Sequence, residues 1–183
     1  MNNQATQPAT KTEPGILTGL FTDKETTESA YQSLRDRGYS EDEIDVLMSD
    51  ETRKKYYGDG TPTTEVGSKA AEGAATGGAI GGTLGAVIAG VAAIGTNLVL
   101  PGLGLVVWGP IAAALAGAGA GGLTGGLVGA LIGAGIPEER ARQYEEGIKN
   151  GGTVLGVTPR TPEDAAFFEK EWSTTHSGQD VVR

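Results

Sequence analysis

Residues 73–137 read GAATGGAIGGTLGAVIAGVAAIGTNLVLPGLGLVVWGPIAAALAGAGAGGLTGGLVGALIGAGIP and contain no charged side chain over 65 positions. Asn97, Pro101-Gly102 and Gly109-Pro110 interrupt the middle of this stretch and leave a helical segment of roughly 25 to 30 residues on each side. The pattern predicts two antiparallel helices that leave a domain, turn between Asn97 and Pro110, and return to it.

Small residues recur at every fourth position in both predicted helices. This spacing places them on one helix face, and a small face lets two helix backbones approach closely. The sequence therefore predicts a helix-packing interface, a glycine zipper, made of Gly73, Gly77, Gly81, Gly85, Ala89, Ala93, Ala113, Gly117, Gly121, Gly125, Gly129 and Gly133.

The opposite side of each predicted helix carries bulky aliphatic residues, so neither side is polar. A surface helix in water needs a polar face, and these helices must therefore be surrounded by lipid, by protein or by copies of themselves. Glycine costs a helix about 1 kcal/mol relative to alanine, whereas lipid penalises unpaired backbone groups more strongly. The balance favours a transmembrane hairpin. A protein interface in a self-assembling particle and a low-complexity disordered tract stay open as alternatives.

The charges that flank the hairpin predict its orientation. Lys69 lies near one end, Arg140, Arg142 and Lys149 follow the other, and the turn carries no charge. Positive residues favour the cytoplasmic side of a membrane, so we expect a membrane protein with both termini in the cytoplasm. A cytoplasmic assembly is the alternative.

The rest of the chain is mixed in charge and divides around the hairpin. We expect a disordered polar leader at residues 1–14, the first half of an α/β domain at 15–62, the hairpin at 63–136, the second half of the domain at 137–173, and a tail or short edge strand at 174–183.

The first half has a strand, helix, strand pattern. An apolar run at Ile16–Phe21 predicts a strand, Thr22 with Glu25 predicts the start of a helix, and Gly38 predicts its end. A second strand follows at Ile44–Met48, and the two strands are expected to be parallel and joined by a right-handed crossover. The inward face of the helix is predicted to carry Ala30, Tyr31 and Leu34.

The second half has a helix, strand, helix pattern. A helix begins at Pro137, a strand spans Thr153–Val157, and Thr161 opens a last helix. Their inward residues are predicted to be Ala141, Tyr144, Ile148, Ala165, Phe168 and Trp172. Neither half is large enough to fold alone. We therefore expect them to pair into one small open-sheet α/β domain of ferredoxin-like type, split by the hairpin.

Few residues suggest chemistry. The chain has no cysteine and one histidine, His176, which we expect to be solvated, so thiolate sites and a Ser/His/Asp triad are excluded. The G-x-G-x-x-G match at Gly117–Gly122 lies inside a predicted helix, where it cannot bind a dinucleotide. With a net charge of −9 and only the short basic run at Arg53–Lys55, nucleic acid is not an expected partner. We expect no catalytic, metal or cofactor site and no small-molecule substrate.

Two segments resemble a bacterial protein family. They are LRDRGYSEDEIDVLMSD at Leu34–Asp50 and GIPEERARQYEEGIKNGGTVLGV at Gly135–Val157, on either side of the glycine zipper. Together they resemble the general stress proteins with a YflT-type domain, similar to general stress protein 17M. The resemblance implies a non-enzymatic bacterial protein associated with environmental stress, so the membrane that we expect for the hairpin is the bacterial inner membrane. The resemblance matches Gly38, Tyr39, Pro137 and Tyr144 as scaffold positions.

Two functions follow from these patterns. The first is a non-enzymatic, stress-associated protein that inserts into the membrane and forms homo-oligomers through the hairpin. The second is a soluble structural protein whose hairpins pack many copies into a filament or shell. A pore is a weaker possibility, because Thr76, Thr83, Thr96 and Thr124 are too few polar residues to line a channel.

Overall fold

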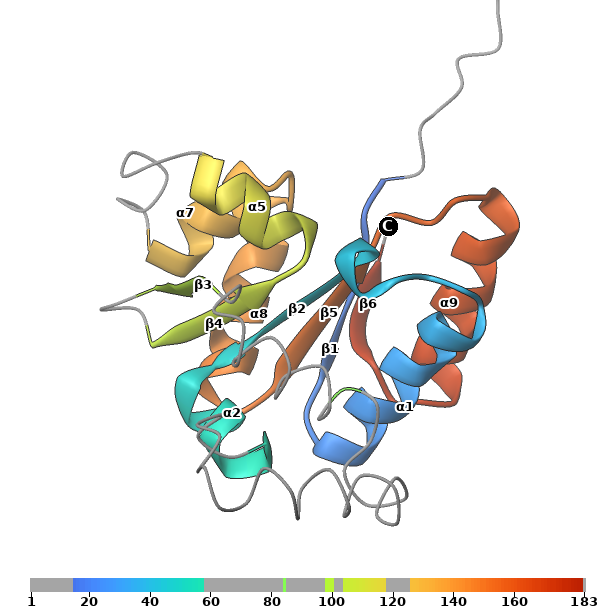
Figure 1. Ribbon diagram of the computed structural model, residues 1–183, viewed down its shortest axis with the longest axis horizontal. Helices are drawn as coiled ribbons and strands as arrows, with labels where there is room; N and C mark the ends of the chain where they lie inside the picture. The colour runs from blue at the N-terminus through green and yellow to red at the C-terminus, as the bar shows by residue number, and fades with distance from the viewer. Residues whose placement is uncertain (1–14, 58–83, 85–97, 101–103, 118–125, 183) are drawn as a thin grey trace, which may run out of the picture.

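The protein is a mixed helix and strand structure, seen in a computed structural model that describes residues 15–57, 84, 98–100, 104–117 and 126–182 (Figure 1). Its centre is an open, antiparallel sheet of six strands in the order β3-β4-β2-β5-β1-β6. The strands are β1 (Leu17–Phe21), β2 (Ile44–Ser49), β3 (Leu98–Leu100), β4 (Leu105–Trp108), β5 (Thr153–Val157) and β6 (Gln179–Val182).

Strand β5 lies between β1 and β2 and is antiparallel to both, with Gly156 opposite Thr18 on one side and Asp45 on the other. The strands of the first half, β1 and β2, therefore run in the same direction, as expected, but they are not neighbours. A strand from the second half separates them, so the two halves of the domain interdigitate. The short C-terminal edge strand is confirmed, since β6 pairs with β1.

Helices α1 (Lys24–Asp36) and α9 (Pro162–Thr174) cover one face of the sheet (Figure 1). Asp23, not Thr22, caps α1, because its side chain accepts a hydrogen bond from the Thr26 amide; Thr161 caps α9 as expected. Gly38 has a φ of +82° just beyond α1, the left-handed conformation that ends helices. The predicted inward residues of both helices are buried: Ala30, Tyr31, Leu34, Ala165, Phe168 and Trp172.

Helices α5 (Pro110–Gly117), α7 (Gly126–Gly133) and α8 (Glu138–Lys149) lie on the other face (Figure 1). Helix α8 approaches the sheet closely at Gly147, where an added Cβ would overlap the side chain of Leu20. Its predicted inward residues, Ala141, Tyr144 and Ile148, are buried in a cluster with Leu47 and Val154. The described part of the chain is thus a three-layer arrangement, with one apolar cluster on each side of the sheet.

Two further elements follow the first half. A single 3₁₀ turn, η1 (Glu41–Glu43), leads into β2, and helix α2 (Asp50–Tyr57) follows that strand at the lower end of the sheet in Figure 1. The basic run Arg53–Lys55 belongs to α2. Arg53 is buried and, like Lys54, forms an ion pair with Asp50.

The expected hairpin of two long helices does not match the described part of residues 73–137. The expected turn contains β3 and β4, which pair with each other and extend the sheet at β2. Both strands are short apolar runs around Pro101 and Gly102, and β4 binds the free edge of β2, so the backbone groups of that edge are satisfied. Within the expected second helix, the structure describes two helices, α5 and α7, of eight residues each.

The lengths of the described helices contradict the predicted transmembrane hairpin. A membrane-spanning helix needs about 20 apolar residues, and no helix in the described ranges is long and apolar enough to cross a membrane. This finding overturns the prediction of a transmembrane hairpin in the bacterial inner membrane. The expected leader, residues 1–14, and the first arm of the hairpin, apart from Leu84, lie outside the described residues.

Candidate assembly surface

Four of the twelve predicted zipper residues are described, and they lie on α5 and α7. Ala113 is exposed on α5, Gly117 is the last residue of that helix, Gly129 is half-buried on α7, and Gly133 is exposed at its end. The other eight lie outside the described residues: Gly73, Gly77, Gly81, Gly85, Ala89, Ala93, Gly121 and Gly125.

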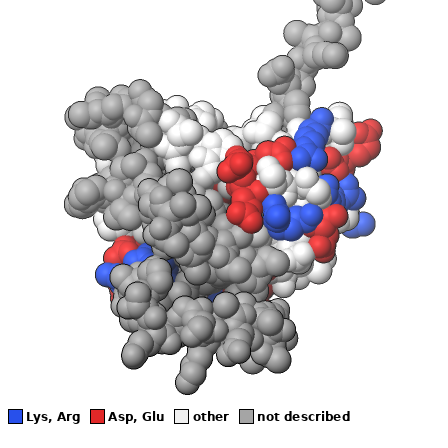
Figure 2. Space-filling model, in the orientation of Figure 1, with Lys and Arg blue, Asp and Glu red and all other residues white. Residues whose placement is uncertain are grey.

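The outward side of α5 and α7 is uncharged and partly apolar. Ile132 is 43% exposed, which makes it one of two large hydrophobic residues exposed among those described. A Cβ added to Gly133 would meet no described atom within 4 Å, so packing within the described protein does not require glycine there. Figure 2 shows white surface around α5 and α7, whereas Lys, Arg, Asp and Glu gather over α1 and α9. We name the outward residues Pro110, Ala113, Ile132 and Gly133 the uncharged patch.

The uncharged patch is attached to the sheet through Asp45 and Gly109. Asp45 is 1% exposed, on the face of β2 that α5 covers, and its Oδ1 accepts a hydrogen bond of 2.6 Å from the Ile111 amide in the first turn of α5. Gly109 has a φ of +93°, and a Cβ there would lie 2.8 Å from the Asp45 Cα and overlap the Ile44 carbonyl oxygen. Only glycine fits between β4 and α5 at this approach.

Burial raises the pKa of Asp45 to about 7, and the hydrogen bond from the Ile111 amide acts in the opposite direction. The cause is loss of water around the charged form, and no charged group among the described residues compensates it. Sequence reasoning missed this residue. The signal that could have found it is a single carboxylate in the otherwise apolar run Ile44–Met48 of a predicted strand.

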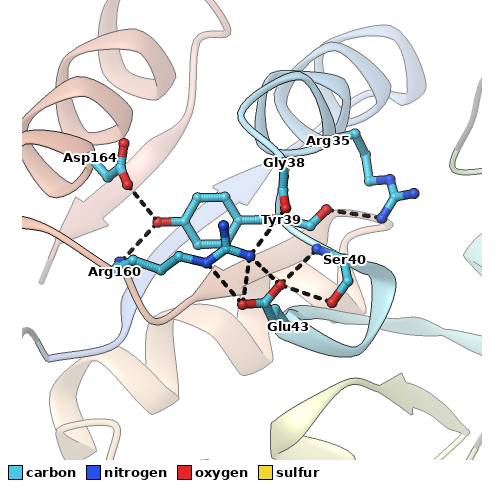
Figure 3. A network of polar contacts seen from close by, with 7 residues as sticks. All are labelled: Arg35, Gly38, Tyr39, Ser40, Glu43, Arg160 and Asp164. Atoms are coloured by element: carbon cyan, nitrogen blue, oxygen red, sulfur yellow. Dashed lines mark hydrogen bonds and ion pairs between the residues drawn. The ribbon is translucent and has the colours of Figure 1, made fainter.

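A network of polar side chains, which we name the Tyr39 group, joins the two halves of the domain (Figure 3). It consists of Tyr39, Glu43, Arg160 and Asp164. The buried Tyr39 hydroxyl donates to Asp164 Oδ2 at 3.0 Å and accepts from the Arg160 amide at 2.9 Å. The Arg160 guanidinium lies 4.3 Å from the centre of the Tyr39 ring and donates to both carboxylate oxygens of Glu43. These contacts connect residues 38–43 with residues 160–164.

The same contacts hold Glu43 in its charged form. Hydrogen bonds from Arg160, followed by those from Ser40, lower the pKa of Glu43 to about 2. Glu43 and Asp45 are two residues apart, and their pKa values shift in opposite directions because one meets a guanidinium at the surface and the other is buried among apolar groups. The Tyr39 group is an anchor between the halves, and its residues are all engaged with each other.

A polar hollow of about 370 Å³ lies where the end of β2, α2 and the α8–β5 turn meet. Ser49 and Thr52 share a hydrogen bond of 2.8 Å in its wall, Lys55 and Lys149 contribute the cationic groups, and Lys149 also pairs with Glu145. The hollow has the size and polarity to admit a small polar molecule. The sequence-based prediction of no small-molecule substrate stays untested.

His176 differs from its expected solvated state. Its side chain is 12% exposed, and Nε2 lies 3.5 Å from Glu171 Oε1 at the end of α9. Within the described ranges, no three His, Cys, Asp or Glu side chains group as metal ligands. In the G-x-G-x-x-G match, Gly117 ends α5 and the following residues lie outside the described ranges.

The chain was compared with known protein families, curated proteins and solved structures. No family model, no curated protein and no solved structure matches the chain. The resemblance to general stress proteins therefore stays a prediction from the two sequence segments.

Proposed function

We propose that this chain is a non-enzymatic structural protein that associates with copies of itself through its uncharged, glycine-rich region, in a role connected with environmental stress. The observation that carries the proposal is the uncharged patch on α5 and α7, with Ile132 exposed at 43%. The chain has a net charge of −9, so copies repel each other over most of their surface. Contact between copies is least opposed where no charge is present.

The small residues of the patch favour a second copy as the occupant. Ala113 and Gly133 leave the backbones of α5 and α7 open to close approach, and nothing described fills the space beside Gly133. Close approach of two such helices gains dispersion contacts and weak Cα–H···O hydrogen bonds. A partner with the same small residues complements this surface, which is the geometry of a self-assembling interface.

The domain that carries the patch is proposed to be a ferredoxin-like scaffold split by residues 63–136. In its support, β1-α1-β2 and β5-α9-β6 are two strand, helix, strand units, and their strands lie in the order β2-β5-β1-β6. Its helices α1 and α9 lie away from α5 and α7, on the opposite face of the sheet in Figure 1. The scaffold then leaves the uncharged patch free for contact between copies.

The test places the same charge on and off the patch. Ile132→Lys adds a lysine to the patch, and Ala166→Lys adds one to an exposed position of α9. We expect the native chain and Ala166→Lys to form large particles, seen by multi-angle light scattering and electron microscopy, and Ile132→Lys to shift the mass toward the monomer. A native chain that stays monomeric at high concentration, or an Ile132→Lys variant of native particle mass, contradicts the proposal.

The connection with stress comes from the resemblance alone and needs its own test. We expect the abundance of the protein in its source organism to rise after heat or salt stress, as measured by quantitative mass spectrometry. Constant abundance under every stress tested contradicts this part of the proposal and leaves the assembly part unaffected.

A further inference from the structure

The first turn of α5 takes its cap from a distant strand. Gly109 precedes the helix and has no side chain, and Pro110 has no amide hydrogen, so Ile111 presents the first free amide. The group that accepts from this amide is Asp45 Oδ1, 66 positions earlier in the chain, at 2.6 Å. A buried helix start without such an acceptor is unfavourable.

The surroundings of Asp45 are shaped to fit its carboxyl group. A Cβ on Gly156, opposite Asp45 on β5, would lie 3.1 Å from Asp45 Cβ and 3.3 Å from Oδ2. A Cβ on Gly109 would lie 2.8 Å from Oδ1. Glycine at both positions makes the space that the carboxyl group occupies, so the fit involves three separate parts of the chain.

No described charge faces this carboxyl group. Gly109 approaches it from the turn after β4, Ile111 from α5 and Gly156 from β5, and the side chain of Ile16 packs beside Gly156. The buried residues of α7 and α8 on this face are apolar except Tyr144, whose hydroxyl donates to Thr18 Oγ1 at 2.8 Å. Among the described residues, Tyr144 is thus the titratable group that the packed elements bring to this side of the sheet.

We infer that Asp45 is the positioning residue of the uncharged patch: its neutral carboxyl group holds the first turn of α5 on the sheet, and its ionisation loosens that attachment. Ionisation strengthens the single hydrogen bond from Ile111. It also places an unpaired charge in an apolar space, and this second effect is the larger one. Opening of the turn between β4 and α5 admits water to the charge. The consequence for assembly rests on the proposed function, whereas the local opening does not.

The direction of the pH dependence follows from linkage. The closed state holds its proton up to a pKa of about 7, whereas an opened, hydrated carboxyl group has the ordinary pKa of 3.8. The closed state therefore binds more protons than the open state between these values, and it loses stability as pH rises through this window. Below pH 3.8 the closed state has its full stability relative to the open state. Above a pH of about 7 this stability does not decrease further.

Amide hydrogen exchange tests the inference directly. In the native chain, protection factors of Ile111 and Ala112 are expected to fall with rising pH by up to roughly tenfold per pH unit between about pH 4 and 7. In Asp45→Asn they are expected to stay constant, because the amide oxygen still accepts from Ile111 and does not titrate. Asp42→Asn, on the exposed η1 turn, is the matched control and should follow the native chain.

The inference is overturned if the protection factors of the native chain do not change with pH, or if they fall in Asp45→Asn as they do in the native chain. If Asp45→Asn does not fold, the carboxyl ¹³C resonance of Asp45 in the native chain decides: a midpoint near the ordinary value overturns the inference and a midpoint near 7 supports it. Particle mass measured over the same pH range separates the two claims. Opening of α5 without any change of mass supports the Asp45 role and counts against the proposed assembly through α5.

Discussion

The two faces of the sheet are held in different ways. On the face of α1 and α9, aromatic rings meet edge to face, such as Phe21 with Trp172 at 5.5 Å between ring centres and Tyr39 with Phe168 at 5.6 Å. Beside them lie the directional contacts of Tyr39, Asp164 and Arg160. On the face of α5, α7 and α8, the buried residues are mainly aliphatic, and glycines set how closely the elements approach.

The difference indicates that the two faces of the sheet depend on different kinds of contact. The aromatic and charged face joins residues that are more than 100 positions apart through hydrogen bonds of defined geometry, which favours one arrangement of the two halves. The aliphatic face depends on shape, and its buried polar contacts include the hydrogen bonds of Asp45 with Ile111 and of Tyr144 with Thr18. We therefore expect loss of a polar group on the face of α1 and α9 to lower the free energy of unfolding. On the face of α5, α7 and α8, we expect an added methyl group or an added charge to lower it.

The largest expected effect comes from a methyl group at Gly109. Gly109→Ala combines a strained φ of +93° with overlap of the Ile44 backbone, and we expect a loss of about 4 kcal/mol in the free energy of unfolding by urea. Gly104→Ala is the matched control. It has a φ of +59° and no described atom within 4 Å, so strain alone should cost about 1 kcal/mol. Equal losses in the two variants contradict the close packing at Gly109.

The second effect is the pH dependence of stability. Since the folded-state pKa of Asp45 is raised to about 7 from 3.8, its contribution is complete below pH 3.8 and is lost as pH rises through 7, by about 2–4 kcal/mol. Glu43 has the opposite sign: its lowered pKa of about 2 contributes above pH 4.5, and this contribution is lost as pH falls toward 2. Urea unfolding between pH 4.5 and 7 therefore isolates Asp45. The slope should disappear in Asp45→Asn and persist in Glu43→Gln.

A smaller effect is expected from the aromatic face. Tyr39→Phe removes a buried hydroxyl that pairs with Asp164 and Arg160 and should lower the free energy of unfolding by about 1–2 kcal/mol. Tyr31→Phe is the control, because the Tyr31 hydroxyl is equally buried but has no hydrogen-bond partner among the described residues. It should be neutral or slightly stabilising. A greater loss in Tyr31→Phe than in Tyr39→Phe speaks against the anchor between the halves.

The smallest effect is expected at the patch itself. Gly133→Ala adds a methyl group to open space at the end of α7, and the higher helix propensity of alanine should stabilise the monomer by less than about 1 kcal/mol. If copies pack against this position, the same change should weaken association, as measured by sedimentation velocity. A strongly destabilised monomer would show that Gly133 is packed within its own chain.

Local patterns predicted most of the scaffold. The strands β1, β2 and β5, the helices α1, α8 and α9, and their buried residues agree with the expectations, because alternation, helical spacing, Gly38 and Thr161 act within a few residues of one another. The strands β3 and β4 were missed, although Val99 and the run Val106-Val107-Trp108 favour strands. The strong uncharged pattern of the surrounding region favoured helices instead.

The sequence by itself determined that two charged halves flank an uncharged, glycine-rich region, and that each half needs the other to bury its strands. Only the tertiary structure decided that β5 enters between β1 and β2, that β4 completes the edge of β2, and that Asp45 caps α5. The reason is physical: capping and amphipathic periodicity are local properties, whereas strand order and the partner of a buried carboxylate depend on contacts across many residues. A single Asp in an apolar strand indicates that its buried carboxyl group needs a hydrogen-bond donor, and only the fold reveals that this donor is the Ile111 amide.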